Sequence, residues 1–329
     1  MKTIRSYAVF CFLGLACTSC VSPQKMSSSP ERWPQANNQA IGHGVVTVDD
    51  PSVFSNVFVI SDVHGMYQPV LAILKAGKVI DQKNNWMAGK SLLIVTGGSI
   101  DKGPQSLEIL SLWIQLQSQS SAAGGGLIHV LGNHEAEFLA DPQGDSKAAT
   151  LLDELKAQNL PLTELTSMDT ARGKFLHNEP VVARIGKWLF FHSGFLPDMS
   201  WSDLVTKSQQ VTAKMDYGND FLIGSDSLLK AKDWEKNSST MKPVLDRMGQ
   251  AGIFGTVFGH QPTAFGIKGR SAAKASGRLI KIDNGMPPEG GSHPGSLLVF
   301  TNPSLMSKMS YPPIKVILPD GSAQDLTPE

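Results

Sequence analysis

Short apolar segments that run directly into polar corners constrain the fold of this chain more than any other feature. Residues 57–60, 91–96 and 127–131 are such segments, and their length and β-branched content predict buried strands. Residues 57–60 are followed by Asp62 and His64, and then by a stretch with apolar residues at helical spacing. The first corner therefore joins a strand to a helix. Such corners lie at the carboxyl ends of strands, where open α/β sheets bind their ligands.

The later corners also carry side chains that bind metals. The second and third corners contain Asp101, Asn133 and His134. Two more histidines, His192 and His260, follow apolar runs in the same way. Carboxylate, amide and imidazole groups at successive strand ends predict a metal centre bound through oxygen and imidazole nitrogen.

The ordered set of motifs resembles that of the calcineurin-like metallophosphoesterases, and within them the bacterial type of the phosphoprotein phosphatase branch. The motifs are Asp62-x-His64-Gly65, Gly97-x-x-x-Asp101-x-Gly103, Gly132-Asn133-His134-Glu135, His192-Ser193-Gly194 and Gly259-His260. The resemblance implies an α/β fold, a metallophosphoesterase-type β-sandwich flanked by helices with a helical cap insertion. It also implies a metal-dependent phosphoric monoester hydrolase, similar to protein phosphatases.

Metal-binding roles follow from the same resemblance. Asp62 and His64 are expected to hold the first of two divalent ions, and Asn133, His192 and His260 the second. Carboxylate, amide and imidazole ligands favour Mn, Fe or Zn. Two such ions clamp a phosphate ester and activate a shared water.

The resemblance assigns proton transfer and phosphate binding to other residues. His134 is expected to act as the general acid or to stabilise the leaving group. Asp101 is expected either to orient His134 or to cap the helix that follows Pro104. Lys102 stands where the family usually has an arginine on the phosphate, and it supplies a point charge in place of a bidentate fork. A second phosphate-binding cation is expected from the cap, with Lys232 as the candidate and Arg247 as the alternative.

Gly98 departs from the family pattern. The family has Gly-Asp-x-x-Asp-Arg-Gly at the second corner, and its first Asp bridges the two metals, whereas this chain has Gly98 there. Loss of a ligand should weaken the first ion's site, by about 10–100-fold or more. The neighbouring Ser99 is expected to point away from the corner. Since the family accommodates Asp at this position, we expect a backbone at Gly98 that an L-residue can adopt.

Several functions therefore remain open. The expected one is a phosphatase weakened by Gly98 or working with one ion, acting on a phosphorylated protein or a small phosphate ester. The alternatives are a non-catalytic binding protein that keeps the fold, and a dinucleoside polyphosphate hydrolase. With 29 basic and 29 acidic residues the net charge is zero, so nothing indicates nucleic-acid binding.

The N-terminal 20 residues predict export. A basic start precedes an apolar stretch, residues 7–16, that is too short to cross a bilayer as a mature helix. The cysteines that follow resemble a bacterial lipoprotein signal, with Cys20 the expected acylation site and Cys17 the alternative. The other interpretation is a plain secretory signal. We expect a protein of the bacterial cell envelope, in the periplasm and anchored to the membrane if it is acylated.

Composition divides the rest of the chain. Residues 21–52 are rich in Ser, Pro, Asn and Gln and predict a flexible leader, and residues 53–320 predict the phosphoesterase domain. Helical fragments in residues 141–178 and 198–249 predict cap segments, and residues 321–329 a tail. Four histidines outside the motifs are interpreted as structural or surface residues: His43, His129, His177 and His293.

Overall fold

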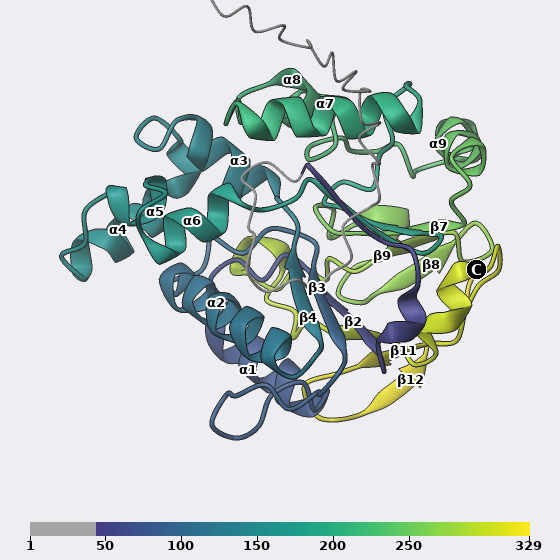
Figure 1. Cartoon of the computed structure of the whole chain (residues 1–329), viewed down its shortest axis with the longest axis horizontal. Coiled ribbons are helices and arrows are strands. Elements are labelled where there is room, and N and C mark those ends of the chain that lie inside the picture. Colours follow the sequence, from purple (N-terminus) through teal and green to yellow (C-terminus); the bar gives the residue numbers. More distant parts are fainter. Residues whose placement is uncertain (1–43) are drawn as a thin grey trace, which may run out of the picture. The chain divides into compact units, whose positions relative to one another are not determined.

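The structure, a computed structural model, describes residues 44–329 (Figure 1). The export signal, both candidate acylation sites Cys17 and Cys20, and most of the expected leader lie outside the described residues. In the described part of the chain, no helix is both long and apolar enough to span a bilayer.

The segments that end in motif corners form the middle and one edge of a six-stranded sheet. Strands β2 (Val57–Ile60), β3 (Leu92–Val95) and β4 (Gly126–His129) are parallel neighbours in this sheet. Strands β10 (Leu297–Phe300), β11 (Ile314–Ile317) and β12 (Ala323–Asp325) extend it antiparallel on the other side of β2.

A second six-stranded sheet carries the remaining two histidine motifs. Its order is β1 (Val45–Val48), β5 (Val182–Ile185), β6 (Trp188–Phe190), β7 (Gly255–Phe258), β9 (Leu279–Lys281) and β8 (Ala272–Lys274). Strands β5 and β6 form an antiparallel hairpin around Gly186. The left-handed φ of Gly186, 60°, suits this tight turn.

Strand residues face two different cores in alternation. Val57 and Val59 pack into a cluster shared with the second sheet, whereas Phe58 and Ile60 pack into a cluster with the helices. This alternation is the period of two that a pleated strand imposes. The first cluster joins the sheets, because the ring of Trp188 on β6 lies 5.3 Å from that of Phe300 on β10. The two mixed sheets confirm the predicted α/β sandwich.

Helices cover the outer face of the first sheet and occupy the two segments that were expected to form a cap. The helices α1 (Tyr67–Ala76) and α2 (Ser106–Ala122) lie beside β2, β3 and β4 (Figure 1), and α3 (Asn133–Ala140) begins directly after β4's corner. The first cap segment holds η2 (Ser146–Ala148), α4 (Ala149–Ala157), α5 (Thr163–Thr166) and α6 (Ala171–His177). The second holds α7 (Trp201–Ala213), α8 (Asp220–Ile223) and α9 (Ser238–Gln250). Short 3-10 turns are η1 (Pro51–Val53), η3 (Ala264–Gly266), η4 (Pro288–Gly290) and η5 (Pro303–Ser307).

Two segment boundaries differ from the expected ones. Strand β1 lies within the expected leader and pairs in parallel with β5, and β12 lies within the expected tail and pairs with β11. Both are short edge strands, with too few residues to show a period. Their partners across the sheet, which local sequence does not reveal, decide their structure.

Replacing Trp188 tests the contact between the sheets. The side chain is fully buried, and Trp188→Ala should lower the free energy of unfolding by about 3–5 kcal/mol because it leaves a cavity between the sheets. Urea denaturation measures the change. Met309→Ala is the control, since Met309 is 56% exposed and its loss should change little. A loss of less than about 1 kcal/mol for Trp188→Ala would show that the packing between the two sheets does not depend on this ring.

Candidate active site

The corners of the first sheet are held together by backbone hydrogen bonds. The N–H of Asp62 donates to the carbonyl of Gly97 at 3.0 Å, and the N–H of His64 to that of Gly98 at 2.8 Å. Parallel pairing in register, Ile60 beside Val95, brings both corners to the same edge of the sheet. Sequence positions more than thirty residues apart therefore share one site.

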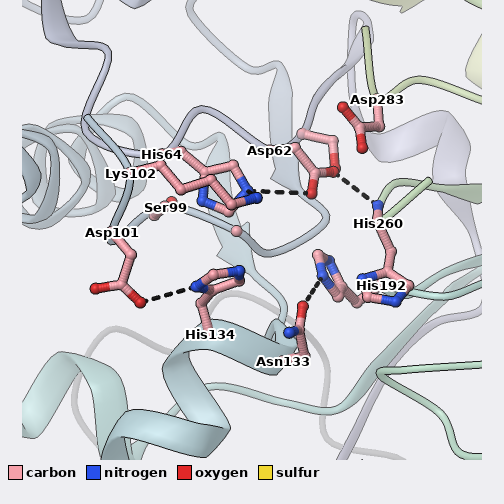
Figure 2. A network of polar contacts seen from close by, with 12 residues as sticks. Asp62, His64, Ser99, Asp101, Lys102, Asn133, His134, His192, His260 and Asp283 are labelled. Carbon is pink, nitrogen blue, oxygen red and sulfur yellow. Dashed lines mark hydrogen bonds and ion pairs between the residues drawn. The ribbon is translucent and has the colours of Figure 1, made fainter. Parts of the chain in front are cut away.

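The motif residues surround one cavity (Figure 2). Its volume is about 470 Å³, and Asp62, His64, Asn133, His134 and His260 contribute to its wall. His192 lies behind this wall, fully buried, with its Nε2 2.9 Å from Oδ1 of Asn133. The structure thus brings together all five residues predicted to bind metal.

Left-handed backbone conformations concentrate at this site. Asp62, His64, Asp101, Lys102 and His260 all have φ between 41° and 66°. Each costs about 1–2 kcal/mol for an L-residue. Such strain persists where the surrounding contacts determine it, and it is typical of active sites and ligand clamps.

Hydrogen bonds fix the orientation of His192 and Asn133. Nδ1 of His192 donates to the carbonyl of Thr96 at 2.8 Å, which leaves the Nε2 lone pair toward Asn133. Nδ2 of Asn133 donates to Oε2 of Glu137 at 3.0 Å, so its Oδ1 faces His192. Two acceptors therefore converge at 2.9 Å. This arrangement suits a shared cation, because a metal ligand usually has its other polar atom held by a second partner.

His260 and Asp62 are linked across the two sheets. Nε2 of His260 donates to the carbonyl of Lys230 at 3.2 Å, which leaves Nδ1 as the free ring nitrogen. The backbone N–H of His260 donates to Oδ2 of Asp62 at 2.9 Å, and the Ser61 hydroxyl donates to the same oxygen. Burial acts to raise the pKa of Asp62, but its polar neighbours, His192 foremost, outweigh burial and lower it. Asp62 is therefore ionised.

Asp101 and His134 form a separate pair, in which His134 lies on the cavity wall and Asp101 is buried behind it. Nδ1 of His134 lies 2.8 Å from Oδ2 of Asp101. Burial, with repulsion from Glu135, raises the pKa of Asp101 to about 8, and burial lowers the pKa of His134. The pair is then neutral overall, with a proton shared between Asp101 and Nδ1. Nε2 of His134 keeps its own proton, which is the state that a general acid requires.

The structure corrects the expectation for the Gly98 backbone. Gly98 has a φ of 71°, in the left-handed region, and not a conformation that L-residues favour. A Cβ at this position would lie 2.9 Å from Oδ1 of Asp62. A side chain here would therefore point at the first metal motif, but it would be strained and would have to displace Asp62.

Glu135 holds the same corner from the opposite side. Its carboxylate accepts hydrogen bonds from the backbone N–H groups of Gly98 at 3.1 Å, Ser99 at 2.6 Å and Ile100 at 3.2 Å. Sequence reasoning gave Glu135 no role beyond its place in the motif. Its position two residues after Asn133, at the start of a helix that follows a corner, is the signal that was available.

His129 supports the corner from within the core. Ser99 points away from the cavity, as expected, and its Oγ lies 2.6 Å from Nε2 of His129. Nδ1 of His129 contacts Glu179 at 2.9 Å, and the indole N–H of Trp113 donates to Ser99 Oγ. All four side chains are buried. His129 has the structural role that its lack of a motif predicted.

The cavity carries three lysines. Lys102 and Lys232, the two predicted phosphate-binding residues, both contribute to its wall, and so does Lys147, which sequence reasoning missed. Lys147 also pairs with Glu137 at 2.6 Å. Arg247 is directed elsewhere, since it lies 3.9 Å from Asp198 and over the ring of Phe195. Arg247 is therefore not among the residues that line this cavity.

A further buried acid, Asp283, lies beside Asp62 (Figure 2). It accepts a hydrogen bond from Gly285 N–H at 2.9 Å, and burial together with the charge of Asp62 raises its pKa. Asp283 follows an apolar strand, so the rule that found the other corners applies to it also. Among residues 44–329, no three histidine, cysteine, aspartate or glutamate side chains are grouped closely enough to hold an ion by themselves.

Parts of this chain are similar in sequence to known proteins. The Arabidopsis thaliana Shewanella-like protein phosphatase 2 is 29% identical over 91 residues, 28% of this chain and 22% of that protein. The Chromobacterium violaceum symmetrical bis(5'-nucleosyl)-tetraphosphatase is 28% identical over 169 residues, 49% of this chain and 50% of that protein. The matched stretches thus span half or less of these relatives.

Solved structures share the fold over most of the chain. A cold-active protein-tyrosine phosphatase of a psychrophilic Shewanella species superposes with a TM-score of 0.67 at 21% identity, covering 93% of this chain and 89% of that one. A protein serine/threonine phosphatase from Saccharomyces cerevisiae gives a TM-score of 0.58 at 14% identity, covering 80% and 78%.

Residues 55–264 match the calcineurin-like phosphoesterase family, the stretch that holds every motif from Asp62 to His260. Proteins of this family are metal-dependent phosphoesterases, typically with two metal ions. With this match over most of the chain, and with the motif residues gathered on one cavity, the chain belongs to the calcineurin-like phosphoesterase family.

Proposed function

We propose that this protein is a metal-dependent phosphoric monoester hydrolase, a metallophosphatase of the protein phosphatase type. The observation that carries the proposal is the position of the His134–Asp101 pair. A protonated donor lies on the same cavity as Asn133, whose amide oxygen meets His192. Ester hydrolysis needs both a proton for the leaving oxygen and a cation for the phosphate.

The side chains at the second ion's place fit a divalent cation. Asn133 Oδ1, His192 Nε2 and the free Nδ1 of His260 are the atoms that would hold it, and Mn, Fe or Zn suits amide and imidazole ligands. When bound, such an ion neutralises phosphate charge and lowers the pKa of a water. His134 Nε2 would donate its proton to the leaving oxygen, and Asp101 would keep the ring oriented.

The lysines on the wall orient the phosphate group. Lys102 and Lys232 present ammonium groups to the same cavity, on the His64 side and the His260 side respectively. Each adds a charge-assisted hydrogen bond to a phosphate oxygen. Gly98 offers no carboxylate between the two ion positions, and we expect it to weaken the first ion's binding and the rate.

For the substrate we favour a phosphorylated protein over a small phosphate ester. The Shewanella-like protein phosphatase 2 relative supports this choice, although it matches only part of the chain. A dinucleoside polyphosphate is the second candidate. The tetraphosphatase relative favours it, as does the third cavity lysine, Lys147, on the His134 side of the cavity, which a second phosphate would contact.

Glu137 connects the cap to the proposed second ion. Its Oε2 accepts from Asn133 Nδ2, and its carboxylate also pairs with Lys147 at 2.6 Å and Lys230 at 2.8 Å. Lys230 in turn holds Nε2 of His260 through its carbonyl. One carboxylate thus orients Asn133 directly and His260 through Lys230, the kind of outer partner that tunes metal affinity.

We expect hydrolysis of an aryl phosphate by the purified protein supplied with Mn²⁺. His134→Asn should lower kcat by about a hundredfold to ten-thousandfold with little change in KM, because the leaving oxygen loses its proton donor. The variant should still bind Mn²⁺, since His134 is not among the proposed ligands. If wild type binds Mn²⁺ yet hydrolyses neither aryl phosphate, phosphopeptides nor a dinucleoside polyphosphate, the protein is a binding module and the proposal is wrong.

Removing the Glu137 side chain tests its role toward the ion. Glu137→Ala should weaken Mn²⁺ binding by about 10–100-fold, because the amide of Asn133 is then free to rotate. Isothermal titration calorimetry measures the affinity. Lys147→Met is the matched control, because it removes one partner of Glu137 and leaves the bond to Asn133 intact. Equal losses of Mn²⁺ affinity in both variants would mean that Glu137 acts through its charge and not through its hydrogen bond to Asn133.

We also propose that the chain is exported and acylated at Cys20, which lies outside the described residues. An apolar stretch too short for a mature membrane helix, followed by the cysteines, supports this. Cys20→Ser should then move the protein from the membrane fraction to the soluble fraction of a bacterial envelope preparation. Cys17→Ser is the control and should leave it membrane-bound. Wild-type protein found in the cytoplasm would contradict export altogether.

A further inference from the structure

We propose that the ammonium group of Lys102 takes the place of the first metal ion, so that this chain works with one divalent ion and one lysine. The inference rests on the proposed function. It concerns which cation occupies the place of the first ion. Measurements of metal binding test it, and measurements of hydrolysis do not.

The first observation concerns the lone pair of His64. Nδ1 of His64 lies 2.8 Å from the carbonyl of Ile100 and donates its proton to it, so Nε2 is the atom available to a cation. Nζ of Lys102 lies 2.9 Å from this Nε2. A single nitrogen lone pair binds one cation. A metal ion on Nε2 of His64 would therefore have to displace the ammonium group of Lys102.

The backbone directs Lys102 to this position. Asp101 and Lys102 are consecutive left-handed residues, with φ of 66° and 62°. The next residue, Gly103, donates its N–H to the carbonyl of His64 at 2.9 Å and so holds the turn against the first corner. Strain of this kind is retained where it positions a functional group. The exposed stem of Lys102 thus carries its ammonium group back onto a buried imidazole.

The second observation concerns Asp62. Its Oδ2 already accepts from the Ser61 hydroxyl and from the N–H of His260. Oδ1 is the oxygen nearer to His64, with Nε2 at 3.6 Å. One carboxylate oxygen and one imidazole nitrogen make a poor ligand set for a divalent ion, but they can both face an ammonium group, which has three donors and no preferred ligand geometry.

The third observation is the charge at the corner. Gly98 removes one negative charge from the position between the two ions, where the family has a bridging carboxylate. With one divalent ion fewer the corner loses two positive charges, and the lysine that stands where the family has an arginine leaves the remaining side-chain charge unchanged. The missing carboxylate therefore offsets one of the two charges that the missing ion takes away.

The ligands of the second ion contrast with this. Asn133 Oδ1 and His192 Nε2 are two acceptors that face each other at 2.9 Å, and no lysine nitrogen is recorded within hydrogen-bond distance of either among the described residues. Each has its other polar atom held by the protein. The structure therefore favours an ion at Asn133 and an ammonium group at His64.

Manganese titration tests this inference. With excess Mn²⁺ the wild type should bind one ion tightly by calorimetry and give the electron paramagnetic resonance spectrum of an isolated Mn²⁺. Lys102→Met removes the ammonium group and keeps an unbranched stem. It should tighten the second equivalent of Mn²⁺ by at least about tenfold, the scale of a gained ligand partner, and give the spectrum of a coupled pair.

Lys232→Met is the control for charge. It removes the same charge from the same cavity wall, but no contact between Lys232 and His64 is recorded. We expect it to leave the wild-type stoichiometry unchanged. Lys102→Gln, a second neutral variant, should behave as Lys102→Met and guards against a folding defect in either.

Three results would overturn the inference: a coupled pair of Mn²⁺ ions in the wild type, an unchanged second equivalent in both Lys102 variants, or equal tightening in Lys232→Met. Each differs from failure of the proposed function. A protein that binds one ion and hydrolyses nothing would still support the assignment of Lys102, whereas an active two-ion wild type would support the function and refute the assignment.

Discussion

The carboxylate of Glu135 holds the corner on which the geometry of the site depends. Three backbone N–H groups of residues 98–100 converge on this fully buried side chain. Burial acts to raise the pKa of Glu135, but nearby histidines and the backbone hydrogen bonds outweigh it and lower the pKa, so the group is charged. The other side of the same backbone accepts from Asp62 N–H, His64 N–H and the ring of His64. A displaced corner would therefore move the first metal motif with it.

Asp62 and Asp101 are both buried, but their pKa values shift in opposite directions. Burial acts to raise the pKa of Asp62, but His192, His64 and the Ser61 hydroxyl outweigh it and lower the pKa. Burial, with repulsion from Glu135, raises the pKa of Asp101 to about 8, and among residues 44–329 its carboxylate has a hydrogen bond to His134 alone. When two environments move the pKa values of two acids in opposite directions in this way, the acids can serve different roles. One carboxylate is kept as an anion, and the other shares a proton with His134.

Local sequence could predict much of this fold because the strands are strongly patterned. Residues 57–60 were predicted as a buried strand, and the structure confirms it. The polar residues that follow this strand and its two parallel neighbours meet at one edge of the sheet, as expected. Lys147 and Glu137 could not be found in this way. They act through contacts between a cap turn and a helix, and such contacts depend on how the chain closes rather than on any period. Gly98 shows the opposite error: an ordinary backbone was expected there from the family pattern, whereas the glycine itself adopts a left-handed φ of 71°.

Gly98 and Lys102 are better understood as one feature of the corner than as two separate departures. They lie on the same turn, one facing Asp62 and the other reaching His64. A glycine alone would leave two ions to repel each other without a carboxylate between them. The lysine stands where the family has an arginine, and its ammonium group lies against the imidazole nitrogen that a first ion would use. In the proposed one-ion site, the two together lower the charge that the corner must hold, and the proposed ligands of the remaining ion, Asn133, His192 and His260, lie on other corners. On this proposal the corner can lose a carboxylate while the cavity still offers one ion and its lysines to a phosphate.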